Sequence, residues 1–98
     1  MSGFYAYGTK MPWHVVSVIP EYPLLHVRFA DEKKATFDLS NIMTKGIFFP
    51  VIKEEEMFNK VGVVDGAVAW AWGLDLAPDN LYKLASEKSE AIIVLQYV

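Results

Sequence analysis

Hydrophobic and polar residues alternate along two neighbouring stretches of the chain, residues 24–29 and 34–39. Successive side chains of a strand point to opposite faces, so this pattern predicts two strands that each bury one face. The residues on the predicted core side are Leu25, Val27, Phe29, Ala35, Phe37 and Leu39.

The polar residues 31–33 separate these two strands, which predicts a hairpin. We expect Phe29 to lie opposite Ala35 and Val27 opposite Phe37. This pairing needs a three-residue loop, or an even-numbered loop with a bulge, because a slip of one residue would turn one apolar face to water.

Two further β-prone regions flank this hairpin. Residues 14–19 are rich in β-branched side chains and end at Pro20, which predicts a strand followed by a proline-rich turn. Residues 60–65 and 67–72 are joined through Asp65-Gly66, a dipeptide that tolerates positive φ and predicts a second hairpin. In its second strand the large residues Val68, Trp70 and Trp72 are expected on one face, and Ala67, Ala69 and Ala71 on the other.

Helical signals are short. Residues 39–46 predict a helical turn capped by Ser40 and ended by Gly46, and residues 54–59 predict a brief helix. Pro78 at a first helical position predicts a helix that runs to about Ser86. The side chains expected to face the core are Ile42, Met43, Met57, Phe58, Leu81, Leu84 and Ala85. Residues 47–52 contain Pro50 and are expected to form a packed loop or a short edge strand.

The last apolar run, residues 91–98, has to pair with another strand, either within the monomer or across a dimer interface. Together these elements predict a single α+β domain over residues 1–98, with a mainly antiparallel sheet and two or three short helices. Within it, residues 1–10 form a polar arm, flexible or ordered, residues 11–84 form the main core, and residues 88–98 add a C-terminal strand.

Composition limits the functions that we expect. The 98 residues suit one domain, and 53% of them are hydrophobic. Nine basic residues against twelve acidic ones give a net charge of −3, and the basic residues are scattered, so direct binding to nucleic acid without a partner is not expected. No run suits a membrane span or a secretion signal, and cysteine is absent, so we expect a cytoplasmic protein.

Candidate chemistry is sparse. His14 and His26 lie on different strands, and neither has a carboxylate or second histidine beside it at ligand spacing. The serines lack a nucleophile elbow, and the glycines form no phosphate-binding loop. We therefore expect no catalytic residue, no metal and no cofactor. The least favoured alternative is a small enzyme acting from a pocket that would bring His26 and Asp75 together.

Aromatic residues are abundant, at 14% of the chain. They serve the core or anchor a protein partner, because they supply contact area at low entropic cost. Asp75 follows the Trp70 to Gly73 segment and precedes the helix at Pro78. It either caps the backbone locally or presents its carboxylate to a partner.

The segment WAWGLDLAPDNLY, residues 70–82, resembles the small bacterial family catalogued as domain of unknown function 2442. Met11-Pro12, residues 29–31, 37–40 and 46–48, and Met57-Phe58 are similar to other parts of that family, so the likeness covers about residues 11–84. Glu32 stands where the family usually has a turn glycine, and residues 88–98 extend beyond the common core.

The resemblance implies a compact α+β fold without an established activity. Some relatives look like DNA-binding proteins with an added helix-turn-helix module, for which this chain has no room, and others look like antitoxins. Our leading hypothesis is a non-enzymatic interaction domain that binds a protein partner or itself through residues 91–98. An antitoxin-like or transcription-accessory regulator, acting with a partner and nucleic acid, is the alternative. The candidate contact residues are Trp70, Trp72, Asp75 and Tyr82.

Overall fold

A computed structural model describes residues 11–44, 52–88 and 90–96 of the chain. The elements are β1 (Val15–Glu21), β2 (Leu24–Phe29), β3 (Lys34–Asp38), the 3-10 turn η1 (Ile42–Thr44), α2 (Glu55–Phe58), β4 (Gly62–Val64), β5 (Ala67–Ala69), the 3-10 turn η3 (Ala71–Gly73), β6 (Asp75–Leu76), α3 (Pro78–Glu87) and β7 (Ile93–Val94). The α+β fold with mainly antiparallel strands is confirmed.

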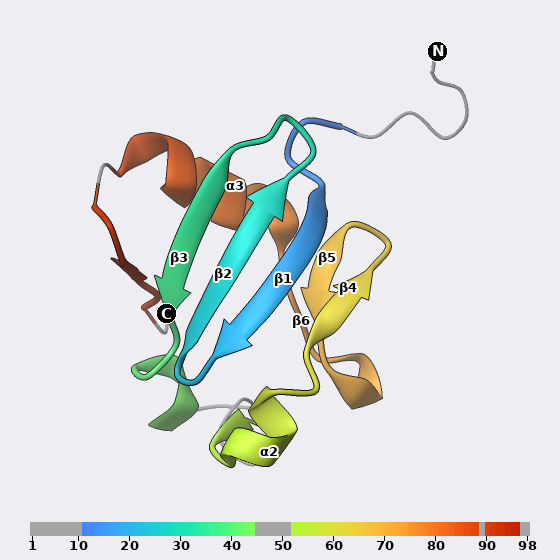
Figure 1. The fold of residues 1–98 in the computed structure, drawn as a ribbon, viewed down its shortest axis with the longest axis vertical. Helices are drawn as coiled ribbons and strands as arrows, with labels where there is room; N and C mark the ends of the chain where they lie inside the picture. The colour runs from blue at the N-terminus through green and yellow to red at the C-terminus, as the bar shows by residue number, and fades with distance from the viewer. Residues whose placement is uncertain (1–10, 45–51, 89, 97–98) are drawn as a thin grey trace.

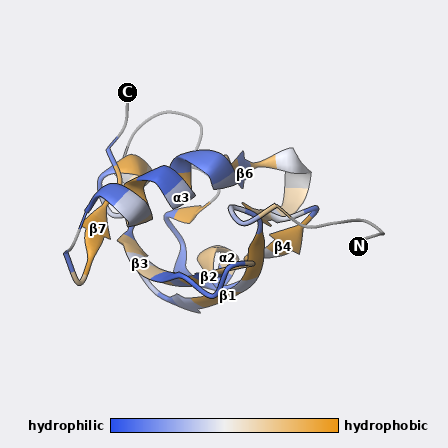
Figure 2. Ribbon diagram, turned by 90° about the horizontal axis from the view of Figure 1, so that it is seen from above, coloured by the Kyte–Doolittle hydropathy of each residue, from blue (hydrophilic) through white to orange (hydrophobic). Residues whose placement is uncertain are grey.

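The strands form two sheets. One has the order β1-β2-β3-β7 and the other β4-β5-β6. In Figure 1 the long strands β1, β2 and β3 face the viewer and α3 lies behind them. Seen from above, these strands form an arc with α3 across its inner side (Figure 2). The first sheet therefore packs its core on one face and leaves the other uncovered.

Strand β1 continues through Pro20 to Glu21, so the prediction that the strand ends at Pro20 is wrong. Phe29 donates its backbone N–H to the carbonyl of Lys33, so the backbone N–H and C=O of Phe29 face β3. These groups face the same side at every second residue of an antiparallel strand, so those of Leu25 face β3 as well. Pro20 pairs with Leu25, so no β2 acceptor needs the N–H that proline lacks. The turn to β2 contains the cis peptide bond between Tyr22 and Pro23.

The hairpin of β2 and β3 is present, but its register differs from the prediction by two residues. Val27 pairs with Ala35, and Leu25 pairs with Phe37. A shift of two keeps every side chain on its face, so the predicted core side is correct. The three-residue loop is confirmed one position earlier, at residues 30–32, and ends at Glu32 with φ of +76°.

The second predicted hairpin is also confirmed. Asp65 and Gly66 both have positive φ and connect β4 to β5. A side chain at Gly66 would lie 3.0 Å from the ring of His14, so the close approach of β1 also favours glycine there. Strand β5 ends at Ala69, because the chain turns at η3 and the Trp70 N–H donates to the carbonyl of Leu74. The predicted strand over residues 67–72 was therefore too long.

The helices follow the sequence signals closely. Helix α3 begins at Pro78 and buries Leu81, as predicted, and α2 buries Phe58. The turn η1 buries Ile42 and Met43, but Ser40 does not cap it; the N–H of Ser40 instead donates to the Asp38 carboxylate. Gly46 and residues 47–51 lie outside the described residues.

The C-terminal segment pairs within the chain. Ile93 is the parallel partner of Phe37 on β3, and Leu95 donates its N–H to the Asp38 carbonyl. The described part of this strand is two residues long, shorter than predicted. It closes the core, whose largest fully buried side chains are Phe29, Phe37, Phe58, Leu25, Leu39, Ile52 and Leu81.

Candidate functional site

Trp70, the first of the predicted contact residues, lies in the core. Only 5% of it is exposed, and its indole N–H donates to the carbonyl of Phe58 at 3.0 Å. A tryptophan that anchors a partner needs its ring at the surface. In this fold Trp70 instead holds β5 against α2.

Asp75 lies exposed on β6, beside a hollow that Trp70 also borders. The N-cap of α3 is Ala77 and no side-chain hydrogen bond caps it, so Asp75 is not the N-cap of this helix. His26 lies at a different hollow, so the pocket required by the enzyme alternative does not form. The side chain of Trp72 lies outside the described residues.

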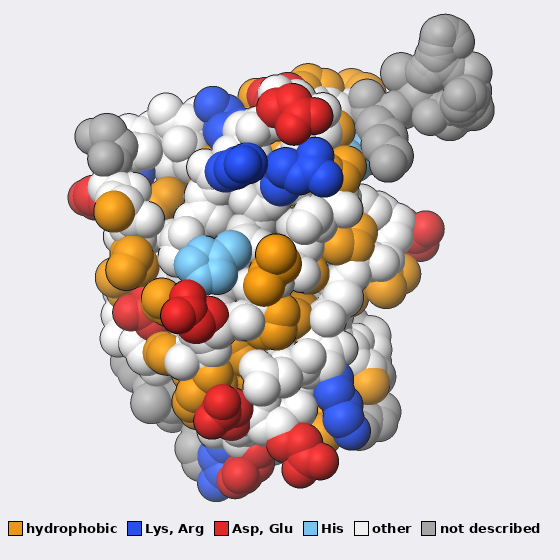
Figure 3. Space-filling model, in the orientation of Figure 1, with side chains coloured by type: hydrophobic (Ala, Val, Ile, Leu, Met, Phe, Trp, Pro, Cys, Tyr) orange, Lys and Arg blue, Asp and Glu red, His pale blue; other side chains and the backbone are white. Residues whose placement is uncertain are grey.

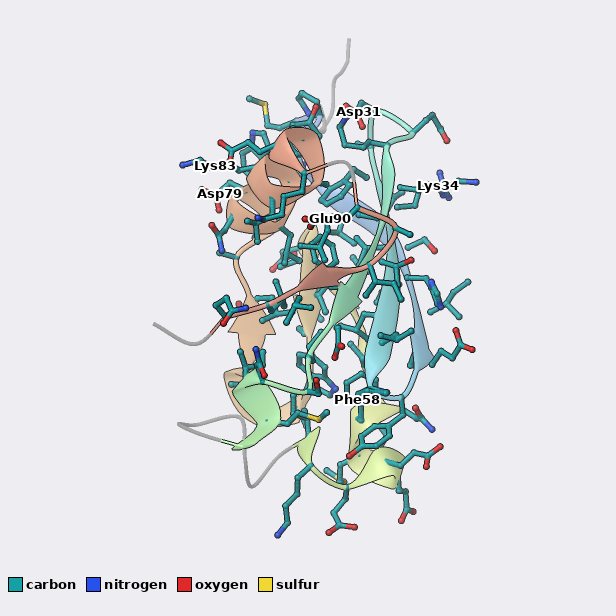
Figure 4. All side chains as sticks on the ribbon, turned by 90° about the vertical axis from the view of Figure 1, so that its left-hand side faces the viewer. Asp31, Lys34, Phe58, Asp79, Lys83 and Glu90 are labelled. Carbon is teal, nitrogen blue, oxygen red and sulfur yellow. The ribbon has the colours of Figure 1, made fainter. Side chains whose placement is uncertain are left out.

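Tyr82 is half-buried at the other end of the molecule from α2. Its hydroxyl donates to Asp31 at 2.6 Å, its ring meets Phe29 edge-on, and the Lys33 ammonium lies 5.6 Å from the ring centroid. The hydrogen bond from Tyr82, followed by that from the Lys33 backbone, lowers the pKa of Asp31, and Asp31 in turn raises the pKa of Tyr82. These contacts fix α3 to the β2–β3 loop (Figure 4).

Residues in two of the segments that carry the family resemblance, 29–31 and 70–82, therefore stabilise the fold. Asp31 and Tyr82 bind each other, and Trp70 binds the Phe58 backbone. Among the predicted contact residues whose side chains are described, Trp70 is buried while Asp75 and Tyr82 lie on different elements, so these three do not form one contact surface.

The uncovered face of the first sheet holds a chain of hydrogen-bonded polar side chains that the sequence did not predict. His26 lies 2.9 Å from the Thr36 hydroxyl through Nδ1 and 2.7 Å from Glu21 Oε1 through Nε2. Antiparallel pairing of β1 with β2 brings the Glu21 carboxylate to His26, a neighbour that spacing along the sequence did not indicate. The only sequence signal was the shared face of residues 26 and 36 in the predicted hairpin.

A hollow of about 530 Å³ borders this chain of polar groups. It extends from the uncovered sheet face around β3 to the connection between α3 and β7. Its charged lining comprises Arg28, Lys34, Lys88 and Glu90. The lining thus has three basic residues and one acidic residue, whereas the whole chain has nine basic and twelve acidic residues. The charge of the hollow is therefore opposite in sign to the net charge of the chain. Figure 3 shows basic side chains next to one another on this face, above a histidine and hydrophobic residues.

The hollow also exposes part of a strand edge. Along β3 the backbone N–H and C=O of one residue face β2 and those of the next face away from it. Lys33 bonds to Phe29 of β2, so the backbone groups of Lys34 face away from β2. Strand β7 pairs only with Phe37 and Asp38. No described strand therefore pairs with the backbone N–H and C=O of Lys34 on the outer side of β3.

Other site types lack support in the part of the chain that the structure describes. No group of three or more His, Asp or Glu side chains there could hold a metal ion. No described helix has the length and apolar character to cross a membrane.

Comparison with known proteins gives one result. No curated protein and no solved structure matches the chain closely enough to indicate a relationship. Residues 14–87 match the model of a family described as protein of unknown function DUF2442, close to the 11–84 expected from sequence. Because this match spans most of the 98 residues, the chain belongs to the DUF2442 family.

Proposed function

We propose that this protein is a non-enzymatic interaction domain that binds an extended segment of a protein chain along the open edge of β3. The observation that carries the proposal is the short pairing of β7, which leaves the Lys34 backbone facing a hollow of about 530 Å³. An extended peptide gains affinity by adding a strand to such an edge, and pockets for its alternate side chains give selectivity. The segment belongs to another protein or to a second copy of this chain.

The surroundings of the edge support a binding role. Ile19, on the uncovered face, is 61% exposed, and Ile92 beside the hollow is 45% exposed. Exposed apolar residues beside unpaired backbone groups favour strand addition unless a charge blocks it, and Lys34 is the residue that limits unselective pairing here. This combination suits a selective partner better than general aggregation.

Photo-crosslinking in the cells that produce the protein tests the proposal. A benzophenone amino acid at Thr36 is expected to capture a protein chain, while the same residue at Lys83 on α3 is not. The proposal fails if both positions capture the same proteins or neither captures any.

The backbone contribution is tested with Lys34→Pro and Lys34→Ala. The Phe29–Lys33 bond places the Lys34 N–H on the outer side of β3, so proline removes the edge donor and leaves the β2–β3 ladder intact. Lys34→Pro is expected to abolish crosslinking from Thr36, whereas Lys34→Ala keeps the donor and is expected to retain it. Circular dichroism of both variants checks that the fold persists.

A further inference from the structure

We infer that the segment bound at β3 is acidic and places a carboxylate side chain beside Lys34, on the sheet face that Lys34 shares with Arg28. This inference rests on the proposed function and names the chemistry of the partner. It follows from the sheet register, the charges in the hollow and the direction of the open edge.

Arg28 and Lys34 are direct cross-strand partners on the uncovered face. Like charges directly opposite each other destabilise a sheet, and a bound anion would offset their repulsion. Ser17 pairs with Arg28 on its other side, and Thr36 follows two residues after Lys34. The Thr36 hydroxyl already bonds to His26 Nδ1, so the two cations, rather than these hydroxyls, supply the attraction for a carboxylate.

Among the described residues the one acidic side chain that forms an ion pair with either cation is Glu32, with Arg28. Glu32 is 3.3 Å from Arg28, but its side chain is 77% exposed, so the contact is weak and replaceable. Glu21 is bound to His26. Among the described residues Lys34 forms no ion pair, and Figure 4 shows it pointing away from the sheet, on the side opposite Asp79 and Lys83.

The register then predicts the pattern of the segment. A strand added beside β3 places its same-face side chains about 5 Å from those of β3. One of them lies beside Lys34, where the edge is open; from Phe37 onward β7 already occupies the edge. The side chain next to it in the segment points to the other face, where Ala85 and Ala91 line the hollow and leave room for a small apolar group. An alternating acidic and apolar segment fits this arrangement.

Fluorescence anisotropy with labelled eight-residue peptides tests the inference. The probes alternate valine with glutamate, glutamine or lysine. The glutamate peptide is expected to bind at least tenfold more tightly than the glutamine peptide at low ionic strength, and the lysine peptide not at all. The preference is expected to shrink at high salt, because these charges are exposed.

Variants separate this inference from the proposed function. Arg28→Gln with Lys34→Gln is expected to remove the preference for glutamate, while the matched control Lys83→Gln retains it. Equal binding of the glutamate and glutamine peptides would overturn the acidic partner and leave the binding edge in place. If no peptide binds, the inference of an acidic segment is also overturned. The proposed function is then judged only by the crosslinking experiment at Thr36.

Discussion

The hydroxyl of Tyr82 lies 2.6 Å from Oδ2 of Asp31, across fifty-one positions of sequence, and joins α3 to the β2–β3 loop. The carboxylate accepts a second hydrogen bond from the Lys33 backbone. Both groups are at the surface, so this contact orients the loop and the helix more than it adds to the core.

Tyr82→Phe is expected to lower the melting temperature by a few degrees, because it removes the hydroxyl and keeps the ring against Phe29. Asp31→Asn keeps an acceptor and removes the charge. A double-mutant cycle of the two changes, followed by thermal unfolding, measures their coupling. Additive effects would show that the hydrogen bond contributes nothing to stability.

The same pair predicts how stability depends on pH. The pKa of Asp31 is lowered by folding, so its contribution is complete above the pKa of the unfolded carboxyl, at about pH 4, and is lost as the pH falls through the folded value. The pKa of Tyr82 is raised, so its contribution is complete below about pH 10 and is lost as the pH rises through the folded value. Denaturant unfolding of the wild type and Tyr82→Phe is expected to differ at pH 7 and to converge in strong acid; a constant difference contradicts this.

Glu32→Gly is expected to raise the free energy of unfolding by roughly 0.5–1 kcal/mol. Glu32 has φ of +76°, where an L side chain is strained. Its exposed contact with Arg28 adds little. Urea unfolding provides the measurement. Asp65→Gly is the comparison, with a smaller gain because aspartate tolerates positive φ better.

Trp70→Phe is expected to destabilise the protein by roughly 2–3 kcal/mol. The smaller ring leaves a gap in the core and deprives the Phe58 carbonyl of the indole donor. Trp13→Phe is the control, since Trp13 is only half-buried, and its cost is expected to be below about 1 kcal/mol. Chemical denaturation followed by circular dichroism compares the two. Similar costs would place Trp70 outside the core.

Ile93→Ala and Ile92→Ala test the pairing of the C-terminal strand within the chain. Ile93 is 2% exposed, and its change to alanine is expected to lower the free energy of unfolding by about 2–4 kcal/mol. Ile92 is 45% exposed, and its change to alanine is expected to lower it little. Unfolding at low protein concentration makes the comparison in the monomer. Equal effects, or a loss that depends on concentration, would indicate pairing across an interface.

The side of each strand that faces the core, and the position of most elements, could be predicted from the amino-acid pattern alone. Alternation placed Leu25, Val27 and Phe37 inside, Asp65-Gly66 marked a hairpin and Pro78 marked the start of α3. These signals are local: a strand has a period of two, a type of turn needs positive φ, and proline fits the first turn of a helix. They remain correct under a register shift of two, which is why the core side was right although the pairing was not.

The strand register, the position of the C-terminal strand and the candidate site depend on contacts between distant parts of the chain and could not be predicted from the sequence. Pairing between strands brought Glu21 and Thr36 to His26, and the packing of α3 brought Tyr82 to Asp31. The sequence leaves Trp70 open between the core and a partner contact, and the fold places it in the core. Side-chain type and spacing do not encode which distant strand or helix a residue meets, because the packing of the whole core selects those neighbours.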